Sequence, residues 1–522
     1  MIAEPPALVA SVAGPLTAPA AAHGRLPAEV RYVEVRADLA GDVGPQPGDV
    51  PGGTIYTLRS TAEGGGCADP PVRRRERLIA AADRYAYVDL EAARDLHPAV
   101  LDRISPERRV ISWHGPATTL DGLRHRFGAL TTVGARLYRL GPAAHTMAQA
   151  LVPLLLLRSL GRDDVTAYAR GPIASWTRLL AARYGAPLIF GRIPEDPPGP
   201  TGGADGELPL RRLLTDYPPQ VLTGADRLYG IIGSATAGSL CPMAHNSAYA
   251  ALGIPALFLP FSTDQLANPL AELRAGFDAL ALPLEALAVI APHKDAAFAL
   301  AAGATPFAFR AGAASLLVRG GDGWWADTES AGVVATLKNR RVRVNHRRVA
   351  VIGCGGGGRA AAAGLAAAGA RVTLVNRSIA GGVRAARLLG LPFEPLRTFD
   401  PRQYQVLVHA TPLRDEMPFR LDGLDQPIAI FDLTYGEKET TLTAAARAAG
   451  HTVVDGSEMT LVQLSRQFHR MTGRHIPARL IRRAQREFGL VISGNGTDDE
   501  PAARPAQPAP QEPAREQERG TR

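Results

Sequence analysis

Lysine is almost missing from this chain of 522 residues. Lysine and arginine together number 58, yet the only lysines are Lys294, Lys338 and Lys438. Lysine carries the side-chain amine that forms an imine with a carbonyl compound, whereas arginine keeps its charge and does not act as a nucleophile. Imine chemistry is therefore excluded from the part of the chain that precedes Lys294.

Cysteines and long apolar segments are also scarce. Cys67, Cys241 and Cys354 are too few and too scattered for a disulfide framework or a metal cluster. No apolar run approaches the length of a membrane span, and the N-terminal segment lacks the basic region of a secretory signal. We therefore expect a cytoplasmic protein without a membrane partner.

The charge balance carries no nucleic-acid signature. The net charge is +8 and the pI about 9.6, but the arginines are dispersed and no basic run alternates with aromatic residues. Hydrophobic residues at 46% and charged residues at 21% are typical of a globular protein. We therefore expect no nucleic-acid partner. Because a chain of this length is too long to fold around a single hydrophobic core, we expect two or three domains.

Residues 1–220 repeat a short β-rich run followed by a helix-length segment. Eight such runs in one block predict a parallel (β/α)8 barrel, which places its chemistry at the strand ends. The predicted strands are Leu8–Val12, Tyr32–Asp38, Thr54–Arg59, Tyr85–Leu90, Val110–Trp113, Leu137–Leu140, Val165–Ala169 and Pro187–Phe190. The polar residues at or just after strand ends are Arg36, Arg59, Glu63, His114 and Arg139.

After the barrel we expect two more α/β units and a tail. Proline and glycine fill residues 194–206, which are predicted to be a loop. The two units span residues 226–338 and 345–456, and helices follow over residues 457–490. Residues 493–522 contain no large apolar side chain, so they cannot bury a core and are expected to be disordered.

A glycine-rich turn between a strand and a helix is the most specific chemical signal. The strand Arg347–Ile352 runs directly into this turn, and an alanine-rich helix follows it. Glycines allow the backbone to approach a pyrophosphate, which then lies at the helix N-terminus. The sequence therefore predicts a dinucleotide site, with a purely structural turn as the alternative. The predicted contacts are Gly353, Gly355, Gly356, Gly357 and Gly358.

The next predicted strand, Arg371–Val375, indicates which dinucleotide binds. NAD-binding domains usually carry an acidic residue at this strand end for the ribose hydroxyls. Here the residues are Asn376, Arg377 and Ser378. Because a guanidinium and a hydroxyl suit a 2′-phosphate, we expect NADP.

Several separated motifs resemble those of shikimate dehydrogenases, in the same order along the chain. The resemblance implies that Lys294 is catalytic and that Gln463 and Tyr435 contact substrate, while Gly456 lies at the cofactor. The motifs are Ser239-Leu-Cys-Pro-Met-Ala-His-Asn246, Pro292-His-Lys294, the glycine turn, Asn376-Arg-Ser378, Asp432-Leu-Thr-Tyr435 and Asp455-Gly-Ser-Glu-Met-Thr-Leu-Val-Gln463.

The barrel resembles type I 3-dehydroquinate dehydratases. The motifs are Val33-Glu-Val-Arg-Ala-Asp38, Leu58-Arg-Ser-Thr-Ala-Glu-Gly-Gly65 and Ser112-Trp-His114. The resemblance implies that Glu63 and His114 move protons and that Arg36, Arg59 and Arg178 hold the substrate. Taken together, the motifs follow the order of the fused, bifunctional shikimate-pathway enzymes.

The barrel departs from its family at the imine-forming residue. The lysine position of the family falls at Arg139, and the family's glutamine on the closing loop is not found within Pro194–Gly206. We therefore expect an impaired dehydratase. For His114 a hydrogen-bonded histidine at a strand end is the alternative.

The dehydrogenase half departs from its family in the pocket. Glu329 stands where the family has the aspartate that pairs with the catalytic lysine. The pocket has also lost hydroxyl and amide groups, so it is expected to bind shikimate weakly or to prefer a less hydroxylated relative. A solvated surface lysine is the alternative for Lys294. The replaced pocket positions are Cys241, Ile290, Ser315 and Leu316.

The sequence thus predicts an α/β protein in which an N-terminal (β/α)8 barrel precedes an α/β substrate domain and a Rossmann NADP-binding domain. The expected reaction is hydride exchange between NADP and a cyclohexene carboxylate, by a monomer or a homodimer. One alternative substrate is a modified shikimate or quinate. A second alternative is a non-catalytic descendant that binds NADP or a pathway intermediate.

Overall fold

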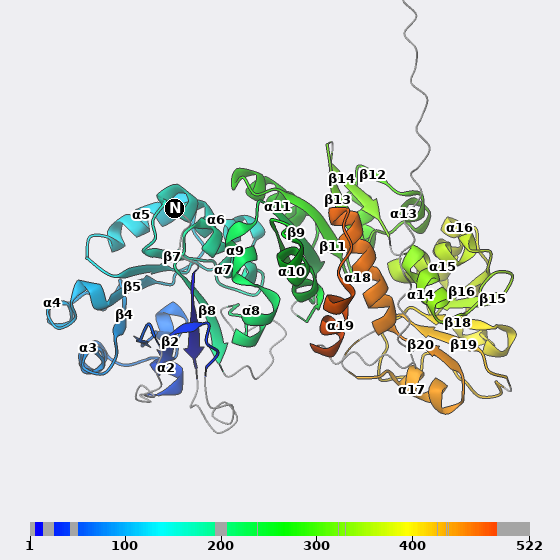
Figure 1. Ribbon diagram of the computed structural model, residues 1–522, viewed down its shortest axis with the longest axis horizontal. Coiled ribbons are helices and arrows are strands. Elements are labelled where there is room, and N and C mark those ends of the chain that lie inside the picture. Colours follow the sequence, from blue (N-terminus) through cyan, green and yellow to red (C-terminus); the bar gives the residue numbers. More distant parts are fainter. Residues whose placement is uncertain are drawn as a thin grey trace, which may run out of the picture.

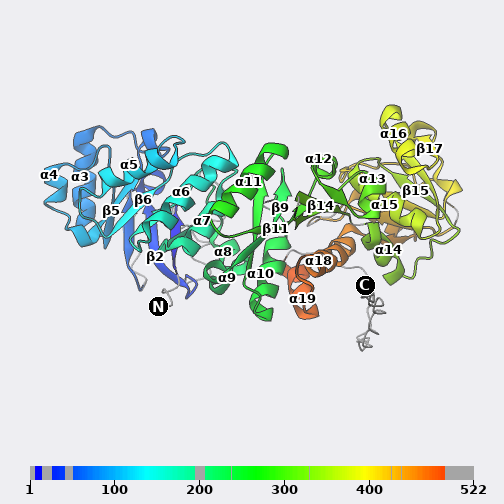
Figure 2. The ribbon, with the colours of Figure 1, turned by 90° about the horizontal axis from the view of Figure 1, so that it is seen from above.

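Three β-sheets succeed one another along an elongated molecule (Figures 1 and 2). The barrel lies at one end, and the sheet formed by strands between residues 348 and 454 lies at the other. Residues 194–205 of the predicted loop at 194–206 lie outside the described residues, as does the predicted tail. The computed structural model describes residues 6–13, 26–41, 51–193, 206–236, 238–321, 323–328, 330–424, 426–434, 436 and 438–487.

The first sheet contains eight parallel strands in the order β7-β6-β5-β4-β3-β2-β1-β8. This confirms the predicted eight-stranded parallel barrel, which is nearly closed because no ladder joins β7 to β8 among the described strands. All eight strands overlap their predicted positions. Their bounds are β1 Ala7–Val12, β2 Val30–Arg36, β3 Thr54–Thr57, β4 Tyr87–Glu91, β5 Arg109–Trp113, β6 Leu137–Leu140, β7 Val165–Ala167 and β8 Leu188–Ile193.

The prediction of β2 was wrong at its end, because the strand stops at Arg36 and the short helix α2 (Ala37–Ala40) follows. The Asp38 carboxylate accepts hydrogen bonds from Arg36 Nε and Nη2 at 2.9 and 2.8 Å. It also accepts one from the backbone N–H of Gly66 at 3.0 Å. These bonds hold Asp38 at the mouth of the barrel, so the chain turns there.

Helices cover the outside of the barrel, and several are only one or two turns long. The α-helices are α3 Pro71–Ala82, α4 Pro98–Leu101, α5 Leu120–Leu130, α6 Met147–Leu160, α7 Ser175–Ala181, α8 Leu210–Asp216 and α9 Pro219–Gly224. The 3-10 turns are η1 Thr61–Glu63, η2 Pro106–Arg108 and η3 Ala182–Tyr184.

The second sheet is mixed, in the order β10-β9-β11-β13-β14-β12, with β13 antiparallel to both β11 and β14. Its strands are β9 Arg227–Gly233, β10 Ala256–Ser262, β11 Leu284–Val289, β12 Gly303–Ala304, β13 Leu316–Gly320 and β14 Gly323–Asp327. The helices are α10 Cys241–Leu252, α11 Ala267–Ala279, α12 Lys294–Ala299 and α13 Pro306–Ala311.

The third sheet is entirely parallel, in the order β17-β16-β15-β18-β19-β20. The strand order reverses between β15 and β18, and such a switch point opens a crevice at the carboxyl ends of the strands. The strands are β15 Arg348–Ile352, β16 Arg371–Asn376, β17 Phe393–Pro395, β18 Val406–His409, β19 Ala429–Asp432 and β20 Thr452–Val454. The helices are α14 Ser330–Asn339, α15 Gly356–Ala367, α16 Ile379–Leu389 and α17 Thr441–Ala448, with the 3-10 turns η4 Leu396–Thr398 and η5 Pro401–Gln403.

The last two helices run from the third sheet back to the second (Figure 1, orange and red). They are α18 (Gly456–Thr472) and α19 (Ala478–Glu487). The Tyr229 hydroxyl on β9 donates to the Met471 carbonyl at 2.9 Å, and α19 packs against α10. The chain after the third sheet is thereby anchored to the second.

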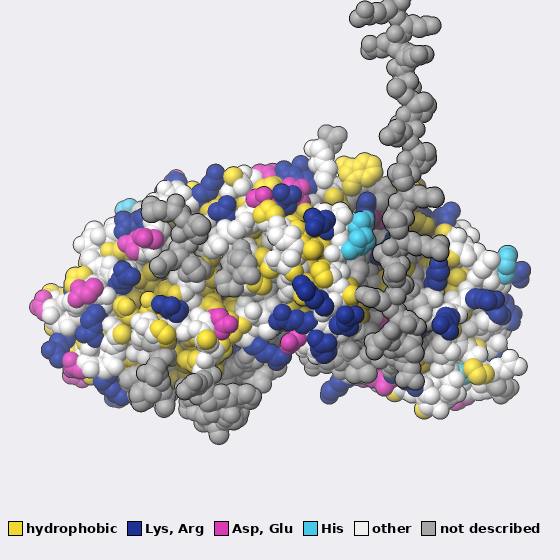
Figure 3. Space-filling view, in the orientation of Figure 1, with side chains coloured by type: hydrophobic (Ala, Val, Ile, Leu, Met, Phe, Trp, Pro, Cys, Tyr) yellow, Lys and Arg dark blue, Asp and Glu magenta, His cyan; other side chains and the backbone are white. Residues whose placement is uncertain are grey.

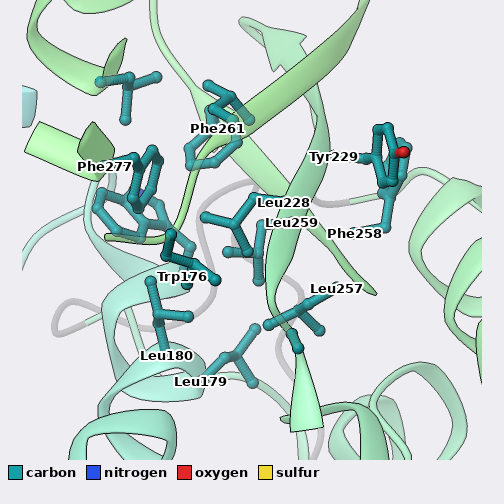
Figure 4. Packing of buried hydrophobic residues seen from close by; sticks show 14 of the residues in the cluster. Trp176, Leu179, Leu180, Leu228, Tyr229, Leu257, Phe258, Leu259, Phe261 and Phe277 are labelled. Atoms are coloured by element: carbon teal, nitrogen blue, oxygen red, sulfur yellow. The ribbon is translucent and has the colours of Figure 1, made fainter. Parts of the chain in front are cut away.

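The barrel and the second sheet share one apolar core (Figure 4). Trp176 on α7 is fully buried, and its ring lies 5.4 Å from that of Phe261 on β10 and 5.5 Å from that of Phe277 on α11. A Cβ at Gly276 would lie 2.1 Å from Leu151 Cδ1 on α6. The absence of that Cβ allows α6 and α11 to approach closely.

Basic side chains are spread over the visible face of the molecule rather than gathered in one field (Figure 3). A local group of exposed arginines occurs on α19, at Arg479, Arg482, Arg483 and Arg486. None of the helices in the described ranges has the length and apolar character needed to cross a membrane.

Candidate active site

The glycine turn lies at the switch point of the third sheet, between β15 and α15. Gly353 has a φ of +109°, and a Cβ there would lie 2.8 Å from the Ala410 carbonyl oxygen. A Cβ at Gly358 would lie 1.9 Å from the Gly353 carbonyl oxygen. These two positions therefore require glycine for the fold. Gly355 precedes α15, is exposed, and has nothing within 4 Å of an added Cβ, so its backbone is open to a ligand.

At the end of β16, Asn376 and Ser378 make hydrogen bonds within the protein, and the side chain of Arg377 is exposed. Asn376 Oδ1 accepts from the Cys354 N–H at 3.3 Å, and Asn376 Nδ2 donates to the Ser378 carbonyl at 2.9 Å. Ser378 Oγ caps α16 by accepting from Gly381 N–H at 3.2 Å. Arg377 is exposed beside them. Arg377 and the hydroxyl of Ser378, which is also exposed, are thus both available to meet a phosphate.

Lys294 begins α12 and meets the glycine turn across the boundary between the second and third sheets. A Cβ at Gly356 would lie 2.9 Å from Lys294 Cβ, and a Cβ at Gly357 would lie 3.9 Å from Lys294 Nζ. The Asp295 carboxylate pairs with Arg359 Nη2 on α15 at 2.6 Å. The structure thus places Lys294 directly beside the predicted cofactor loop.

One predicted pocket residue, Ser315, lies next to the Lys294 segment. The Lys294 carbonyl accepts from Ala314 N–H at 2.8 Å, so Ser315, which is buried, follows this contact immediately. Ser239 is buried as well, and its Oγ accepts from Cys241 N–H at 3.1 Å at the start of α10.

The second half of the Ser239–Asn246 motif belongs to the core rather than to a pocket. Asn246 bonds the backbone of Phe258 in both directions and donates to the Asp216 carbonyl at 2.9 Å. The His245 ring stacks on Phe258 with centroids 4.3 Å apart, and burial lowers the pKa of His245 to about 3. These two residues stabilise the contact between α10 and β10.

The remaining predicted residues lie around α18, and two of them cannot be placed. Glu329 and Tyr435 are outside the described residues. Gly456 starts α18, and a Cβ there would lie 2.1 Å from the Thr434 carbonyl oxygen, so only glycine allows this approach. Gln463 is half-buried about two turns further along α18.

In the barrel, the structure brings Glu63 and His114 together. Glu63 Oε2 accepts from the His114 backbone N–H at 2.8 Å and lies 3.2 Å from His114 Nδ1. Burial, together with the charge of the nearby Glu91, raises the pKa of Glu63 to about 8. Burial and the charge of Arg59 lower the pKa of His114 well below its usual value. At neutral pH both members of the pair are therefore uncharged.

Arg139, at the position where the resemblance implies a lysine, is enclosed by partners. Its Nη1 lies 2.5 Å from Glu34 Oε1, and its Nε donates to the Tyr168 hydroxyl at 2.8 Å. The guanidinium also lies over the Phe190 ring at 4.0 Å. Burial alone would raise the pKa of Glu34, but the charges of Arg139, Arg36 and Arg59 together outweigh burial and lower that pKa. A buried ion pair occupies the centre of the barrel.

The three other predicted arginines also have protein partners in the barrel mouth. Arg36 is bound by Asp38, as described above, and the Arg178 guanidinium lies over the Tyr168 ring at 3.8 Å. Arg59 is buried, and desolvation together with the charge of Arg36 lowers its pKa. Glu207 is buried in the same region, where desolvation raises the pKa of its carboxyl group against the influence of Arg178.

Both the barrel and the part of the chain that follows it are similar to known proteins. The family model of type I 3-dehydroquinase matches residues 15–217. The shikimate dehydrogenase (NADP(+)) of Halobacterium salinarum is 35% identical over 269 residues, which cover 50% of this chain and 98% of that protein. The chain belongs to the shikimate dehydrogenase family.

One fused protein is similar to this chain over both the barrel and the dehydrogenase half. The chloroplastic bifunctional 3-dehydroquinate dehydratase/shikimate dehydrogenase of Arabidopsis thaliana is 25% identical over 460 residues, covering 82% of this chain and 74% of that protein. A solved structure of dehydroquinate dehydratase and shikimate dehydrogenase from S. pombe covers 92% of this chain and 98% of its own, with 18% identity and a TM-score of 0.41.

Sequence reasoning missed several charged residues of this shikimate dehydrogenase fusion. Glu34 was quoted within a motif but given no role, although a glutamate flanked by valines in a barrel strand indicates a buried charge. Arg359 was also missed. It donates to the Cys354 and Ala311 carbonyls at 3.0 and 2.7 Å besides pairing with Asp295. In the described residues no group of histidine, cysteine and acidic side chains could hold a metal ion.

Proposed function

We propose that the protein is an NADP-dependent oxidoreductase that interconverts shikimate, or a close analogue, with its keto acid. The observation that carries the proposal is the contact of Lys294 with the glycine turn at the switch point of a parallel sheet. The relative from Halobacterium salinarum is named as an NADP(+) enzyme, and the exposed Arg377 suits a 2′-phosphate.

The residues present fit a dinucleotide. Gly353 and Gly358 allow the close backbone approaches that form the tight turn, while Gly355 exposes backbone at the start of α15. Backbone N–H groups there would hold the pyrophosphate, and Arg377 would pair with the 2′-phosphate. NADP+ supplies a hydride acceptor when it is bound.

Lys294 is the predicted acid–base residue of the reaction. From the start of α12 its ammonium can donate to the reacting oxygen of the substrate and exchange the hydroxyl proton. Glu329 remains the predicted partner of Lys294. Ser239, Ser315 and Gln463 are the predicted contacts to the carboxylate and hydroxyls of the ring.

Shikimate oxidation by wild type and Lys294→Ala tests this proposal directly. We expect NADPH formation by the wild type and a loss of about a hundredfold or more in kcat for Lys294→Ala, the scale of acid–base catalysis. Lys338→Ala is the matched control, because Lys338 is exposed on α14. Equal rates for Lys294→Ala and wild type would contradict the role of Lys294.

The side chain of Ile290 favours a second candidate substrate, a less hydroxylated relative of shikimate. Ile290 is half-buried next to the Lys294 segment, at a position where the resemblance implies a hydroxyl residue. An apolar side chain there leaves a substrate hydroxyl without a partner, which costs roughly 1–3 kcal/mol. A panel of cyclitol acids, including quinate, would rank substrates. A kcat/KM for a less hydroxylated acid above that for shikimate would favour the analogue.

For the barrel we infer that dehydration through an imine does not occur. Support comes from Arg139, which cannot form an imine and whose guanidinium is held by Glu34 and Tyr168. Borohydride added with 3-dehydroquinate is expected to leave wild type unlabelled, whereas Arg139→Lys offers an amine at that position. Borohydride-dependent labelling of the wild type by 3-dehydroquinate would overturn this inference.

We further propose that the barrel spans residues 1–220 and that the substrate and cofactor domains span 226–338 and 345–456. The helices of residues 457–490 then complete the substrate domain. The protein is proposed to work in the cytoplasm as a monomer or homodimer on a small-molecule cyclohexene carboxylate. Light scattering on purified protein measures its oligomeric state.

A further inference from the structure

A buried histidine–aspartate pair lies at the carboxyl ends of β18 and β19. His409 and Asp432 are the last residues of these strands and stand opposite each other in the parallel ladder. Both are completely buried, and His409 Nδ1 lies 3.0 Å from Asp432 Oδ1. No residue of this pair has a role in the reaction outlined above.

The partners of Asp432 determine which nitrogen of His409 carries the proton. Asp432 Oδ1 accepts from both the N–H and the hydroxyl of Thr434, at 3.0 and 2.7 Å, and Oδ2 accepts from Thr440 Oγ1 at 2.7 Å. A carboxylate that accepts this many hydrogen bonds is ionised. His409 Nδ1 therefore donates to Asp432, and in this tautomer Nε2 is an acceptor.

Thr411 is the third member of the chain of hydrogen bonds. Its Oγ1 lies 2.5 Å from His409 Nε2, so the hydroxyl proton points at the ring. The Leu413 N–H approaches the same oxygen at 3.5 Å. Thr411 is half-buried, and its oxygen keeps a lone pair for a donor outside the protein.

Thr411 belongs to the wall of the predicted cofactor crevice. A Cβ at Gly353 would lie 2.9 Å from Thr411 Cγ2 and 2.8 Å from the Ala410 carbonyl oxygen. The loops after β15 and β18 flank the switch point of the sheet, where a dinucleotide enters an open α/β sheet. The hydrogen-bond chain thus ends at the glycine turn.

We propose that His409 is a positioning residue for the dinucleotide, because it holds the Thr411 hydroxyl as a hydrogen-bond acceptor that faces the crevice. The inference rests on the proposed NADP-dependent function. It assigns to Thr411 a bond from an N–H or O–H donor of the cofactor. Asp432 holds the orientation of the His409 ring, and the His409 ring in turn holds the orientation of the Thr411 hydroxyl.

Four variants of the full-length protein separate this role from simple packing. His409→Asn keeps a donor toward Asp432 but is too short to reach Thr411. Thr411→Val removes the hydroxyl at nearly constant volume, Thr411→Ser retains it, and the double variant His409→Asn/Thr411→Val completes a cycle. The measurements are NADP+ affinity by calorimetry, the KM values for NADP+ and shikimate, and the melting temperature.

We expect His409→Asn and Thr411→Val each to raise the KM and the Kd for NADP+ about tenfold, the scale of one lost hydrogen bond to a buried group. Thr411→Ser is expected to retain wild-type values, and the double variant to be no weaker than the weaker single variant. The KM for shikimate stays unchanged, because the hydroxyl faces the cofactor.

An NADP+ affinity of His409→Asn equal to that of wild type, or additive effects in the double variant, would overturn the proposal. Should His409→Asn not fold, the comparison of Thr411→Val with Thr411→Ser decides, since Thr411 is half-buried. Wild type that binds NADP+ without oxidising shikimate would refute the proposed reaction. The calorimetric cycle would still test His409.

Discussion

Arg139 shows how one residue changes the chemistry of a whole barrel. An arginine carries the charge of a lysine but cannot form an imine, and it makes several directed hydrogen bonds where lysine acts as a point charge. Here those bonds reach Glu34 and Tyr168, and the Asp89 carboxylate lies 3.6 Å away. Removal of one member of such a buried pair costs about 3–5 kcal/mol. The network is therefore expected to stabilise the present fold and to resist return to a lysine.

The Glu63–His114 pair predicts a pH dependence of stability. The folded-state pKa of Glu63 is raised to about 8 by burial, so its favourable contribution is complete below the unfolded value and is lost as the pH rises through 8. The glutamine in Glu63→Gln cannot ionise, so this variant does not lose stability as the pH rises through 8. We expect the melting temperature of Glu63→Gln to rise relative to that of wild type between pH about 5 and pH about 9.

Glu76→Gln provides the control for this measurement, since Glu76 is exposed on α3. Its difference from wild type is expected to stay flat over the same range. A melting-temperature difference for Glu63→Gln that does not grow with pH would mean that Glu63 is already ionised at neutral pH. The neutral pair described above would then be wrong.

Among the helices, α15 depends most directly on single glycines. The Gly358 Cβ position lies 1.9 Å from the Gly353 carbonyl oxygen, so Gly358→Ala displaces the turn. We expect this variant to lose roughly 1–3 kcal/mol of stability without any ligand present, the range for overpacked sites. Gly355→Ala meets nothing within 4 Å and is the matched control. Equal denaturant midpoints for the two variants would contradict the close approach.

The elements were more predictable than the interactions between them. Alternating apolar runs located all eight barrel strands, and the strands predicted at Arg347–Ile352 and Arg371–Val375 match β15 and β16 to within one residue at each end. The glycine turn was located because its residues are contiguous. The partners of Arg139 were not, because Glu34 lies 105 positions away. Asp295 and Arg359 are 64 positions apart and pair only in the folded chain.

At the scale of the whole molecule, the barrel is a structural part of the shikimate dehydrogenase half. Helix α6 contributes the N–H of Ala148, which donates to Glu272 Oε2 at 2.9 Å on α11. Arg183 of η3 donates to the Ala225 carbonyl at 2.9 Å, and the Tyr184 hydroxyl donates to the Leu280 carbonyl at 3.3 Å. With Trp176 and its aromatic partners, these contacts cover one face of the second sheet. Even without dehydratase activity, the barrel would still be needed to bury this face of the second sheet.

Trp176→Ala tests this dependence in the full chain. Deletion of a buried tryptophan costs about 3–5 kcal/mol, and Phe261 and Phe277 in the second sheet unit lose their ring contact. We expect the temperature at which shikimate oxidation is lost to fall in Trp176→Ala. Trp113→Ala is the control within the barrel, because Trp113 lies on β5 and packs against Arg126. If both variants lower that temperature equally, the halves are coupled through the whole barrel. If neither lowers it, the dehydrogenase half is stable without the barrel, and the shared core contributes nothing to its activity.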